Sequence, residues 1–173
     1  MDGPYSGLAR RPYRIPMLIE EQLFIAAPVD RVWSLIGDPA RMPGLSPELR
    51  RITWVGAPNP TVGGEFRGHN GVGPLRWRTR NVIEVADPGR TFAWRTMDGP
   101  GYSFVSRWTY RLEPRCGGCE VTERFETASR LAVAITGALL WGRGRMLRNG
   151  MRTTLESIKA AAEDGPPGAG DSG

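Results

Sequence analysis

Histidine and cysteine are scarce in this chain of 173 residues, which has one histidine, His69, and two cysteines. A structural zinc site needs four ligands, and these residues supply at most three side chains. His69 also has no apparent acid or base partner in the sequence. We therefore expect no metal and no cofactor, and we expect His69 to lie on a surface strand near a hairpin end.

Long hydrophobic runs are also lacking. The longest apolar stretch, LAVAITGALLW at residues 131–141, is about half as long as a membrane-spanning helix. The opening stretch, MDGPYSGLARRPYRIP, has no apolar core of the kind found in secretory signals. We expect a soluble cytoplasmic protein without a transmembrane segment, in which residues 131–141 form either a core helix or a mobile lid.

Lysine is nearly absent, although the formal net charge is +5. Only Lys159 is a lysine, so the other basic residues are arginines, and these are spread along the chain without long runs. A positive charge often indicates an anionic partner. Here it comes without a basic helix or an aromatic RNA-binding motif, so nucleic acid is an unlikely partner.

The two cysteines, Cys116 and Cys119, lie in EPRCGGCEV between two strand-like runs. A redox-active CxxC usually begins a helix, where the thiol pKa is lowered. The pair Gly117-Gly118 instead predicts a two-residue hairpin turn. A disulfide between Cys116 and Cys119 across this short turn is the remaining alternative to two free thiols.

The composition divides the chain into one domain and two loose ends. Residues 1–16 are expected to form an irregular arm, and residues 164–173 a disordered Gly/Pro-rich tail. The remaining residues 17–163 are enough for a single core. Strands are predicted at residues 18–26, 49–55, 64–70, 75–86, 90–96, 102–114 and 119–127. One or two short helices are predicted between residues 28 and 49, and a long helix at about residues 141–163.

This order predicts an α+β fold with a curved, seven-stranded antiparallel sheet. The long C-terminal helix must lie across one face of the sheet, because only that arrangement buries the apolar sides of both. Strong curvature separates helix and sheet at one end, so we expect a cavity there.

Alternation along the strands predicts which side chains face this cavity. If Phe66 points inward, Gly68 and Asn70 do so too, while Arg67 and His69 point away. On the next strand one face carries Leu75, Trp77, Thr79, Asn81, Ile83 and Val85, and the opposite face carries Arg76, Arg78 and Arg80. The apolar set should be the inner one, since burying unpaired guanidinium groups is very costly. A bulge would invert this assignment.

The expected ligand-binding residues are mostly aromatic, with a few polar groups that suit a flat or elongated apolar ligand. They are Trp33, Phe66, Asn70, Trp77, Thr79, Asn81, Phe92, Trp94, Phe104, Ser106, Trp108, Tyr110, Glu123, Met146 and Met151. Asn149 and Thr153 are further candidates on the last helix. The same aromatic residues are also compatible with an ordinary filled core.

Three of these residues, Tyr110, Glu123 and Asn81, are the only candidates for acid–base chemistry. An inward-facing Glu123 would have a raised pKa because of desolvation, or would pair with an arginine such as Arg107 or Arg51. The alternative is that Glu123 lies at a wet mouth or on the outer face.

Several phrases resemble the START-like superfamily, also called the Bet v allergen-like or SRPBCC group. They are IAAPVDRVWSLIGDPARMPGLSPELRRITWV, GGEFRGHN, RWRTRNVIEVADPGRTFAWRT, SRWTYRLEP, VTERFE and MLRNGMRTTLESIKAAAE. The chain is most similar to the bacterial polyketide cyclase/dehydrase branch, over about residues 18–163. The resemblance implies a helix-grip fold, but it does not determine an activity, because this fold serves many functions.

Three functions follow from this reading. The first is binding of a small hydrophobic molecule, such as a lipid, a fatty acid or a polyketide-like aromatic, by a monomer or homodimer. The second, implied by the resemblance, is a polyketide aromatase/cyclase that works without metal or redox cofactor. The third is an interaction module that docks a protein or a membrane surface through the arginine face or residues 131–141.

Overall fold

A computed structural model of the protein describes residues 17–98, 103–127 and 143–164. The predicted arm at residues 1–16, the apolar segment at residues 131–141 and nearly all of the predicted tail lie outside these residues. The described part consists of one sheet, two short helical segments and one long helix.

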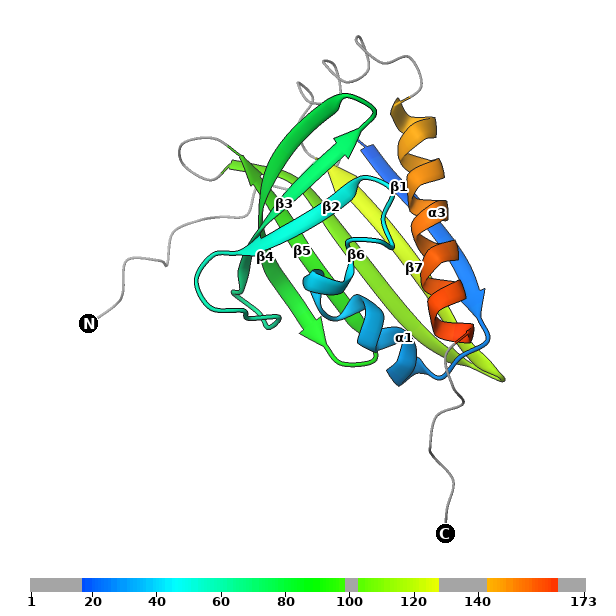
Figure 1. The fold of residues 1–173 in the computed structure, drawn as a ribbon. Coiled ribbons are helices and arrows are strands. Elements are labelled where there is room, and N and C mark those ends of the chain that lie inside the picture. Colours follow the sequence, from blue (N-terminus) through cyan, green and yellow to red (C-terminus); the bar gives the residue numbers. More distant parts are fainter. Residues whose placement is uncertain (1–16, 99–102, 128–142, 165–173) are drawn as a thin grey trace, which may run out of the picture.

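Seven strands form a single antiparallel sheet in the order β1-β7-β6-β5-β4-β3-β2. The strands are β1 (Met17–Ile25), β2 (Leu49–Trp54), β3 (Glu65–Val72), β4 (Leu75–Asp87), β5 (Thr91–Asp98), β6 (Ser103–Arg115) and β7 (Gly118–Thr127). All except β1 follow one another as neighbours, and β1 adds to the free edge of β7. The sheet curves around the long helix (Figure 1), which confirms the predicted helix-grip fold.

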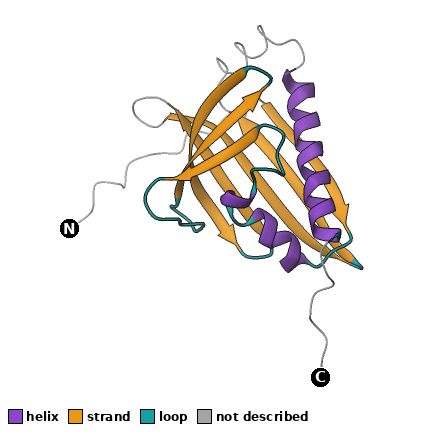
Figure 2. Cartoon of the chain, in the orientation of Figure 1, coloured by secondary structure: helices purple, strands orange, loops and turns teal. Residues whose placement is uncertain are grey.

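The helices occupy two positions along the chain (Figure 2). Helix α1 (Val29–Ile36) follows Pro28 and ends at Gly37, and a 3-10 turn, η1 (Pro39–Arg41), comes directly after it. The Asp38 side chain caps this turn by accepting a 2.9 Å hydrogen bond from the Ala40 amide. Helix α3 (Arg143–Glu163) closes the described chain.

Register shifts in the central strands contribute to the curvature of the sheet. One lies on β4 between Ile83 and Val85, where the chain has an extra residue relative to β5. After the shift, Ala86 is opposite Phe92 and packs against the core. The prediction that Val85 shares the inner face with Ile83 is therefore wrong, because the bulge reverses the alternation at that point.

Helix α3 meets the sheet with two different halves. Leu155, Ile158 and Ala162 of the C-terminal half are buried in the main core, which α1 also covers. Leu147 and Met151 of the N-terminal half form a smaller cluster with β1. The two halves therefore have different roles, and the hollow described below lies beside the N-terminal one.

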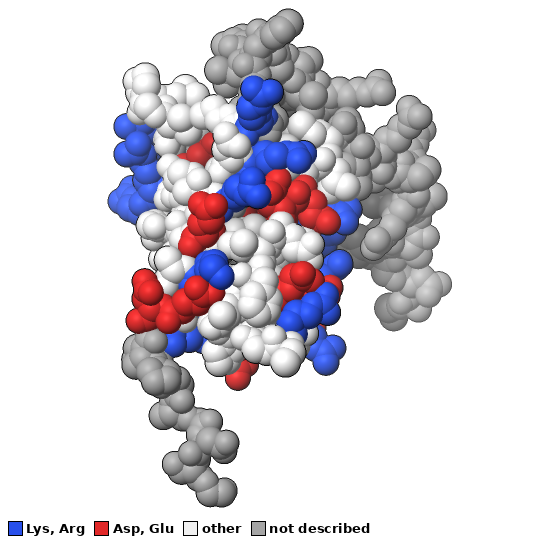
Figure 3. Space-filling view, turned by 90° about the vertical axis from the view of Figure 1, so that its right-hand side faces the viewer, with Lys and Arg blue, Asp and Glu red and all other residues white. Residues whose placement is uncertain are grey.

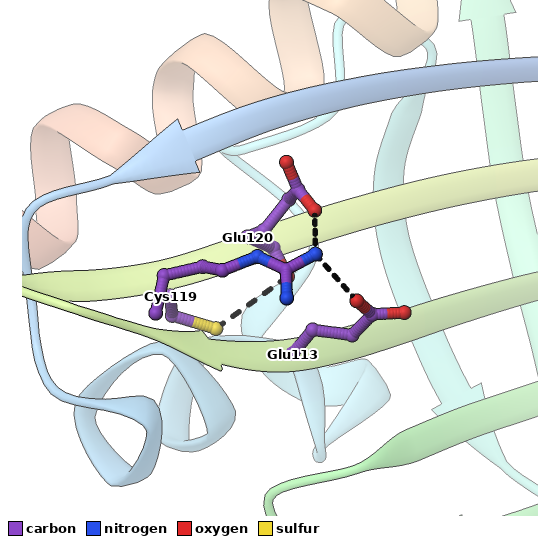
Figure 4. A network of polar contacts seen from close by, with 4 residues as sticks. Glu113, Cys119 and Glu120 are labelled. Atoms are coloured by element: carbon purple, nitrogen blue, oxygen red, sulfur yellow. Dashed lines mark hydrogen bonds and ion pairs between the residues drawn. The ribbon is translucent and has the colours of Figure 1, made fainter.

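The hairpin between β6 and β7 turns one residue earlier than predicted. Arg115 pairs with Gly118, so the turn residues are Cys116 and Gly117, and Gly117 takes the positive φ of 77°. Both thiols are free: Cys116 is exposed and Cys119 is buried. The Arg115 guanidinium joins the two strands by contacting Glu113 at 2.7 Å and Glu120 at 2.6 Å (Figure 4).

The charged outer surface carries both signs side by side, as the view in Figure 3 shows. On the outer face of the central strands, Glu84 binds Arg95 at 3.2 Å and Arg107 at 3.0 Å. Arg80 binds Glu65 on the neighbouring strand. Several arginines of this surface are thus paired with carboxylates of neighbouring strands.

Candidate functional site

A cavity of about 450 Å³ lies between the inner face of the sheet and the N-terminal half of α3. This volume is within the usual range for small-molecule sites. The described side chains around it come from all seven strands, from Met42, from residues 46–48 and from α3. The C-terminal half of α3 instead packs against the core, so the cavity is closed at that end.

Strand register arranges the inner face of the sheet in rows that cross the strands. The polar row consists of Asn81, Thr96, Ser106 and Thr127, each directly opposite the next. Thr96 donates a 2.9 Å hydrogen bond to the Asn81 carbonyl oxygen, and the Asn81 amide donates to Thr79 at 3.1 Å. All four members of the row line the cavity.

The next row is aromatic and consists of Trp94, Trp108 and Phe125, again on adjacent strands. The Trp94 and Trp108 rings stack with centroids 6.3 Å apart, and the Trp108 and Phe125 centroids are 4.7 Å apart. This aromatic row forms the middle of the cavity wall. It offers the kind of flat apolar surface that binds a planar ligand.

Beyond the aromatic row, Tyr110 and Glu123 face each other on β6 and β7. The Tyr110 hydroxyl donates a 2.7 Å hydrogen bond to Oε1 of Glu123. The other oxygen, Oε2, has no hydrogen-bond partner among the described residues. Both side chains are buried, with exposures of 1% and 2%, and both line the cavity.

Burial dominates the electrostatics of this pair. It raises the pKa of Glu123 to about 8, against the lowering effect of the Tyr110 hydrogen bond, and the charge of Glu21 raises it further. Glu21 lies opposite Glu123 on β1. Burial and the nearby Glu123 also raise the pKa of Tyr110 well above its ordinary value. Glu123 is therefore mostly protonated at neutral pH.

The arginine partners considered for Glu123 are not in contact with it. Arg107 points to the outer face and binds Glu84, and Arg51 is exposed on β2. Of the explanations considered from the sequence, desolvation is the one that the structure supports. Tyr110, directly opposite, is the hydrogen-bond partner.

Most of the residues predicted to bind a ligand do line the cavity. They are Phe66, Asn70, Trp77, Thr79, Asn81, Trp94, Ser106, Trp108, Tyr110, Glu123 and Met151. Trp33 and Phe92 do not, because they pack edge to face in the core with centroids 6.1 Å apart. Phe104 belongs to β6 and is paired with Met97, but its side chain lies outside the described part.

The face of α3 that lines the cavity differs by one position from the predicted one. Leu147, Gly150 and Thr154 line it together with Met151, whereas Met146 does not. Asn149 and Thr153, proposed as further candidates, are exposed. Gly150 leaves space, since a Cβ added there would meet only Pro47 Cγ at 3.8 Å.

Sequence reasoning missed Thr96 and Thr127, which complete the polar row. Thr96 follows the predicted Trp94 by two positions, and Thr127 follows the predicted Glu123 by four, so extending the same alternation would have found them. Glu21 was missed as well, because its proximity to Glu123 depends on the pairing of β1 with β7, which the sequence does not encode locally.

His69 lies outside the cavity, as predicted. It shares a separate surface pocket with Arg50, Arg76 and Arg78 and hydrogen-bonds Thr53 at 3.2 Å. Desolvation, together with the charges of neighbouring arginines, lowers its pKa. Arg78 departs from the prediction, because it also contributes to the lining of the main cavity.

Two further properties concern the described residues as a whole. Within residues 17–98, 103–127 and 143–164, none of the helices combines the length and the apolar composition of a membrane span. Over the same residues, no three His, Cys, Asp or Glu side chains gather closely enough to hold a metal ion.

Comparison with known proteins gives a consistent family. The sequence model described as "Polyketide cyclase / dehydrase and lipid transport" matches residues 17–163. The solution structure of the Polyketide_cyc-like protein Cgl2372 from Corynebacterium glutamicum is 27% identical, with a TM-score of 0.54. That match covers 86% of this chain and 91% of Cgl2372. Comparison with curated proteins gave no match.

More distant solved structures share the fold. The di-domain ARO/CYC StfQ from the steffimycin biosynthetic pathway is 21% identical over 85% of this chain, with a TM-score of 0.67. The match covers 50% of StfQ, so this chain spans about half the length of that protein. Ara h 8.0201 is 15% identical, with a TM-score of 0.64, and the match covers 86% of this chain and 99% of Ara h 8.0201.

Proposed function

Since the chain belongs to the family described as polyketide cyclase / dehydrase and lipid transport, we propose that it binds one small, largely apolar molecule between the sheet and α3. The observation that carries this proposal is the 450 Å³ cavity and its aromatic row. Protein cores rarely contain voids much larger than a water molecule. A hollow of this size with an organised lining therefore favours a binding site over a filled core.

The lining favours a flat molecule over a flexible chain. Trp94 and Trp108 stack with an angle of 16° between their planes, which gives a broad surface for contact with a ring system. Among the ligand classes expected from the sequence, a polyketide-like aromatic fits this surface better than a lipid or a fatty acid does. A fatty-acid carboxylate would also be disfavoured next to the buried Glu123.

One observation favours a second function, an aromatase/cyclase. Glu123 is a buried acid with a pKa of about 8, so at neutral pH it holds a proton that it can transfer to a bound substrate. In an aldol closure it would protonate the ketone oxygen as the enol carbon of the same substrate forms the new carbon–carbon bond, and its carboxylate would then take up the enol O–H proton, which restores the acid. In the subsequent dehydration it would protonate the departing hydroxyl, which leaves as water, while the carboxylate takes up the proton lost from the neighbouring carbon.

The first test is native mass spectrometry of the freshly purified protein, followed by organic extraction of any bound molecule. We expect an adduct of a few hundred daltons in a one-to-one ratio. The Gly150→Leu variant, whose added side chain enters the cavity, is the matched control and should lack this adduct. An adduct of equal intensity on the variant would place the ligand elsewhere, and an apo protein that also fails to bind an apolar dye would exclude the cavity as the site.

Turnover separates the two functions. If the protein only carries its ligand, the extracted molecule is recovered unchanged after incubation, in the wild type and in Glu123→Gln. If it is a cyclase, a poly-β-ketone substrate is converted by the wild type, and Glu123→Gln binds the substrate without converting it. The amide of this variant preserves the shape of the side chain but has no acidic proton to transfer.

A further inference from the structure

We propose that the ligand is a flat, uncharged molecule with a hydrogen-bonding oxygen at each end, one bound by Glu123 and the other by the polar row. This inference rests on the proposed function, because it describes the molecule that the cavity takes. Four observations support it: the spacing of the polar groups, the free oxygen of Glu123, the hydroxyls of Thr96 and Ser106, and the surrounding charges.

The spacing follows from strand geometry. Glu123 and Thr127 are four residues apart on β7, and Tyr110 and Ser106 are four apart on β6. At about 3.3 Å per residue, the two polar ends are separated by roughly 13 Å along the strands. The aromatic row fills the interval on both strands. This arrangement matches a molecule of about three fused rings with oxygens at its opposite ends.

At the end formed by Glu123 and Tyr110, here called the deep end, the protein provides a hydrogen-bond donor. Oε1 of Glu123 accepts the proton of the Tyr110 hydroxyl, so in the neutral carboxylic acid the acidic proton belongs on Oε2. Oε2 is the oxygen with no partner among the residues that the structure describes. A buried donor without a partner is costly. A ligand carbonyl or hydroxyl oxygen that accepts this proton removes the cost.

At the opposite end the protein offers hydroxyl groups. Thr96 uses its proton for Asn81, so its oxygen remains able to accept a hydrogen bond. The Ser106 hydroxyl makes no hydrogen bond with any residue in the described ranges, although it is only 7% exposed. A hydroxyl can donate or accept. A ligand hydroxyl or carbonyl therefore finds a partner at this end.

The charges around the deep end disfavour an ionised ligand. Glu21, opposite Glu123 on β1, forms an ion pair with Arg148 of α3 at 3.6 Å, so the nearest described cation is already paired with a carboxylate. A ligand cation would require both itself and Glu123 to be charged and dehydrated, and burying such a pair rarely repays its desolvation. The other charged side chains of the lining are Glu48, just before β2, and Arg78 of β4, so the rest of the lining carries one charge of each sign.

Four fused-ring probes test this inference with the full chain. They are anthraquinone, 2-hydroxyanthraquinone, 2,6-dihydroxyanthraquinone and anthraquinone-2-carboxylate, and their dissociation constants are measured by quenching of tryptophan fluorescence. A net neutral hydrogen bond corresponds to roughly a fivefold change in affinity. We expect each added hydroxyl to tighten binding by about fivefold, and anthraquinone-2-carboxylate to bind more weakly than anthraquinone.

Variants at the two ends assign the contacts. Glu123→Leu and Ser106→Ala should each abolish the gain in affinity that the second hydroxyl gives, so that the dihydroxy and monohydroxy probes bind the variant equally; each ratio is taken within one variant, with that variant's own affinity for anthraquinone as the reference. Glu123→Gln keeps a donor at the deep end, so it should retain the preference for two hydroxyls. If Glu123→Leu unfolds the protein, Ser106→Ala still tests the opposite end.

The outcomes separate this inference from the proposed function. If anthraquinone binds and the hydroxyls add nothing, the two-ended recognition is wrong while the cavity remains a binding site. If the carboxylate binds best, the ligand is an anion and the inference is equally wrong. If no probe binds and native mass spectrometry shows no adduct, the proposed function fails, and the inference fails with it.

Discussion

The Tyr110 hydroxyl and Oε1 of Glu123 lie 2.7 Å apart on directly opposed positions of β6 and β7. This hydrogen bond is formed in a nearly dry environment, where it determines which carboxyl oxygen accepts and which carries the proton. The carboxyl group of Glu123 therefore has one accepting oxygen and one proton-bearing oxygen before any ligand binds. Burial of the pair also raises the pKa of Glu123, and this shift makes the stability of the fold depend on pH.

The raised pKa of Glu123 predicts that stability falls as pH rises. The pKa increases from 4.5 to about 8 on folding, so between these values the folded protein holds a proton that the unfolded chain has lost. The free energy of unfolding should therefore decrease across this range, by an amount on the order of a few kcal/mol, and its contribution should be constant above pH 8. Urea denaturation at several pH values measures it.

The Glu123→Gln variant is the control for this pH dependence. It cannot titrate, so the difference in stability between wild type and variant isolates the contribution of Glu123 from that of other groups. We expect this difference to change steadily between pH 5 and about pH 8. A difference that is independent of pH would show that the carboxyl titrates normally and that it is not buried as described.

The position of Gly150 on the cavity wall predicts that ligand affinity and protein stability can be changed independently. Gly150 lines the cavity, and a Cβ added there lies in ordinary contact with Pro47 at 3.8 Å; replacing a helical glycine by alanine usually stabilises by up to about 1 kcal/mol. Gly150→Leu should abolish binding of anthraquinone without lowering the melting temperature. Gly150→Ala should raise the melting temperature and retain most of the affinity. Loss of stability in both variants would mean that the helix is packed more tightly at this point.

Phe92 and Trp108 are expected to respond oppositely to truncation. Phe92 is fully buried in the core, so Phe92→Ala should cost about 3–5 kcal/mol of stability and leave the affinity of the folded molecules largely unchanged. Trp108 borders the cavity, so Trp108→Ala should cost less stability and weaken anthraquinone binding by about tenfold. Calorimetry and fluorescence titration measure both quantities. Equal effects of the two changes on both quantities would indicate one continuous core.

The two thiols should differ in reactivity. Cys116 is exposed in the hairpin turn, whereas burial raises the pKa of the Cys119 thiol. A thiol-specific reagent such as Ellman's should titrate one thiol per folded chain at pH 8 and two in denaturant. No reactive thiol in either state would instead reveal a disulfide across the turn.

The fold was accessible from the sequence because its signals are local. Apolar alternation and Gly/Pro turns marked each strand, and the spacing of Leu155, Ile158 and Ala162 marked the long helix. The errors arose where geometry depends on a neighbouring strand. The bulge after Ile83 has no local signal, and it exchanges the roles of Val85 and Ala86.

The candidate site was predictable only in part for the same reason. Alternation placed Tyr110 and Glu123 on the inner face, but it did not show that they would lie opposite each other, which requires the register of β6 with β7. It also did not separate cavity from core, because Phe92 and Trp94 share one face of β5. That distinction depends on where α3 stops packing closely against the sheet.

The division of α3 into two halves has a consequence for how such a protein can change over evolutionary time. Its C-terminal half secures the fold, whereas the positions that shape the hollow, such as Leu147 and Gly150, contribute little to the main core. A substitution at Gly150 can therefore adapt the hollow to another small compound at little cost in stability, whereas one at Leu147 also disturbs the smaller cluster with Ile19 and Met151. One fold can in this way evolve into proteins that bind different small molecules.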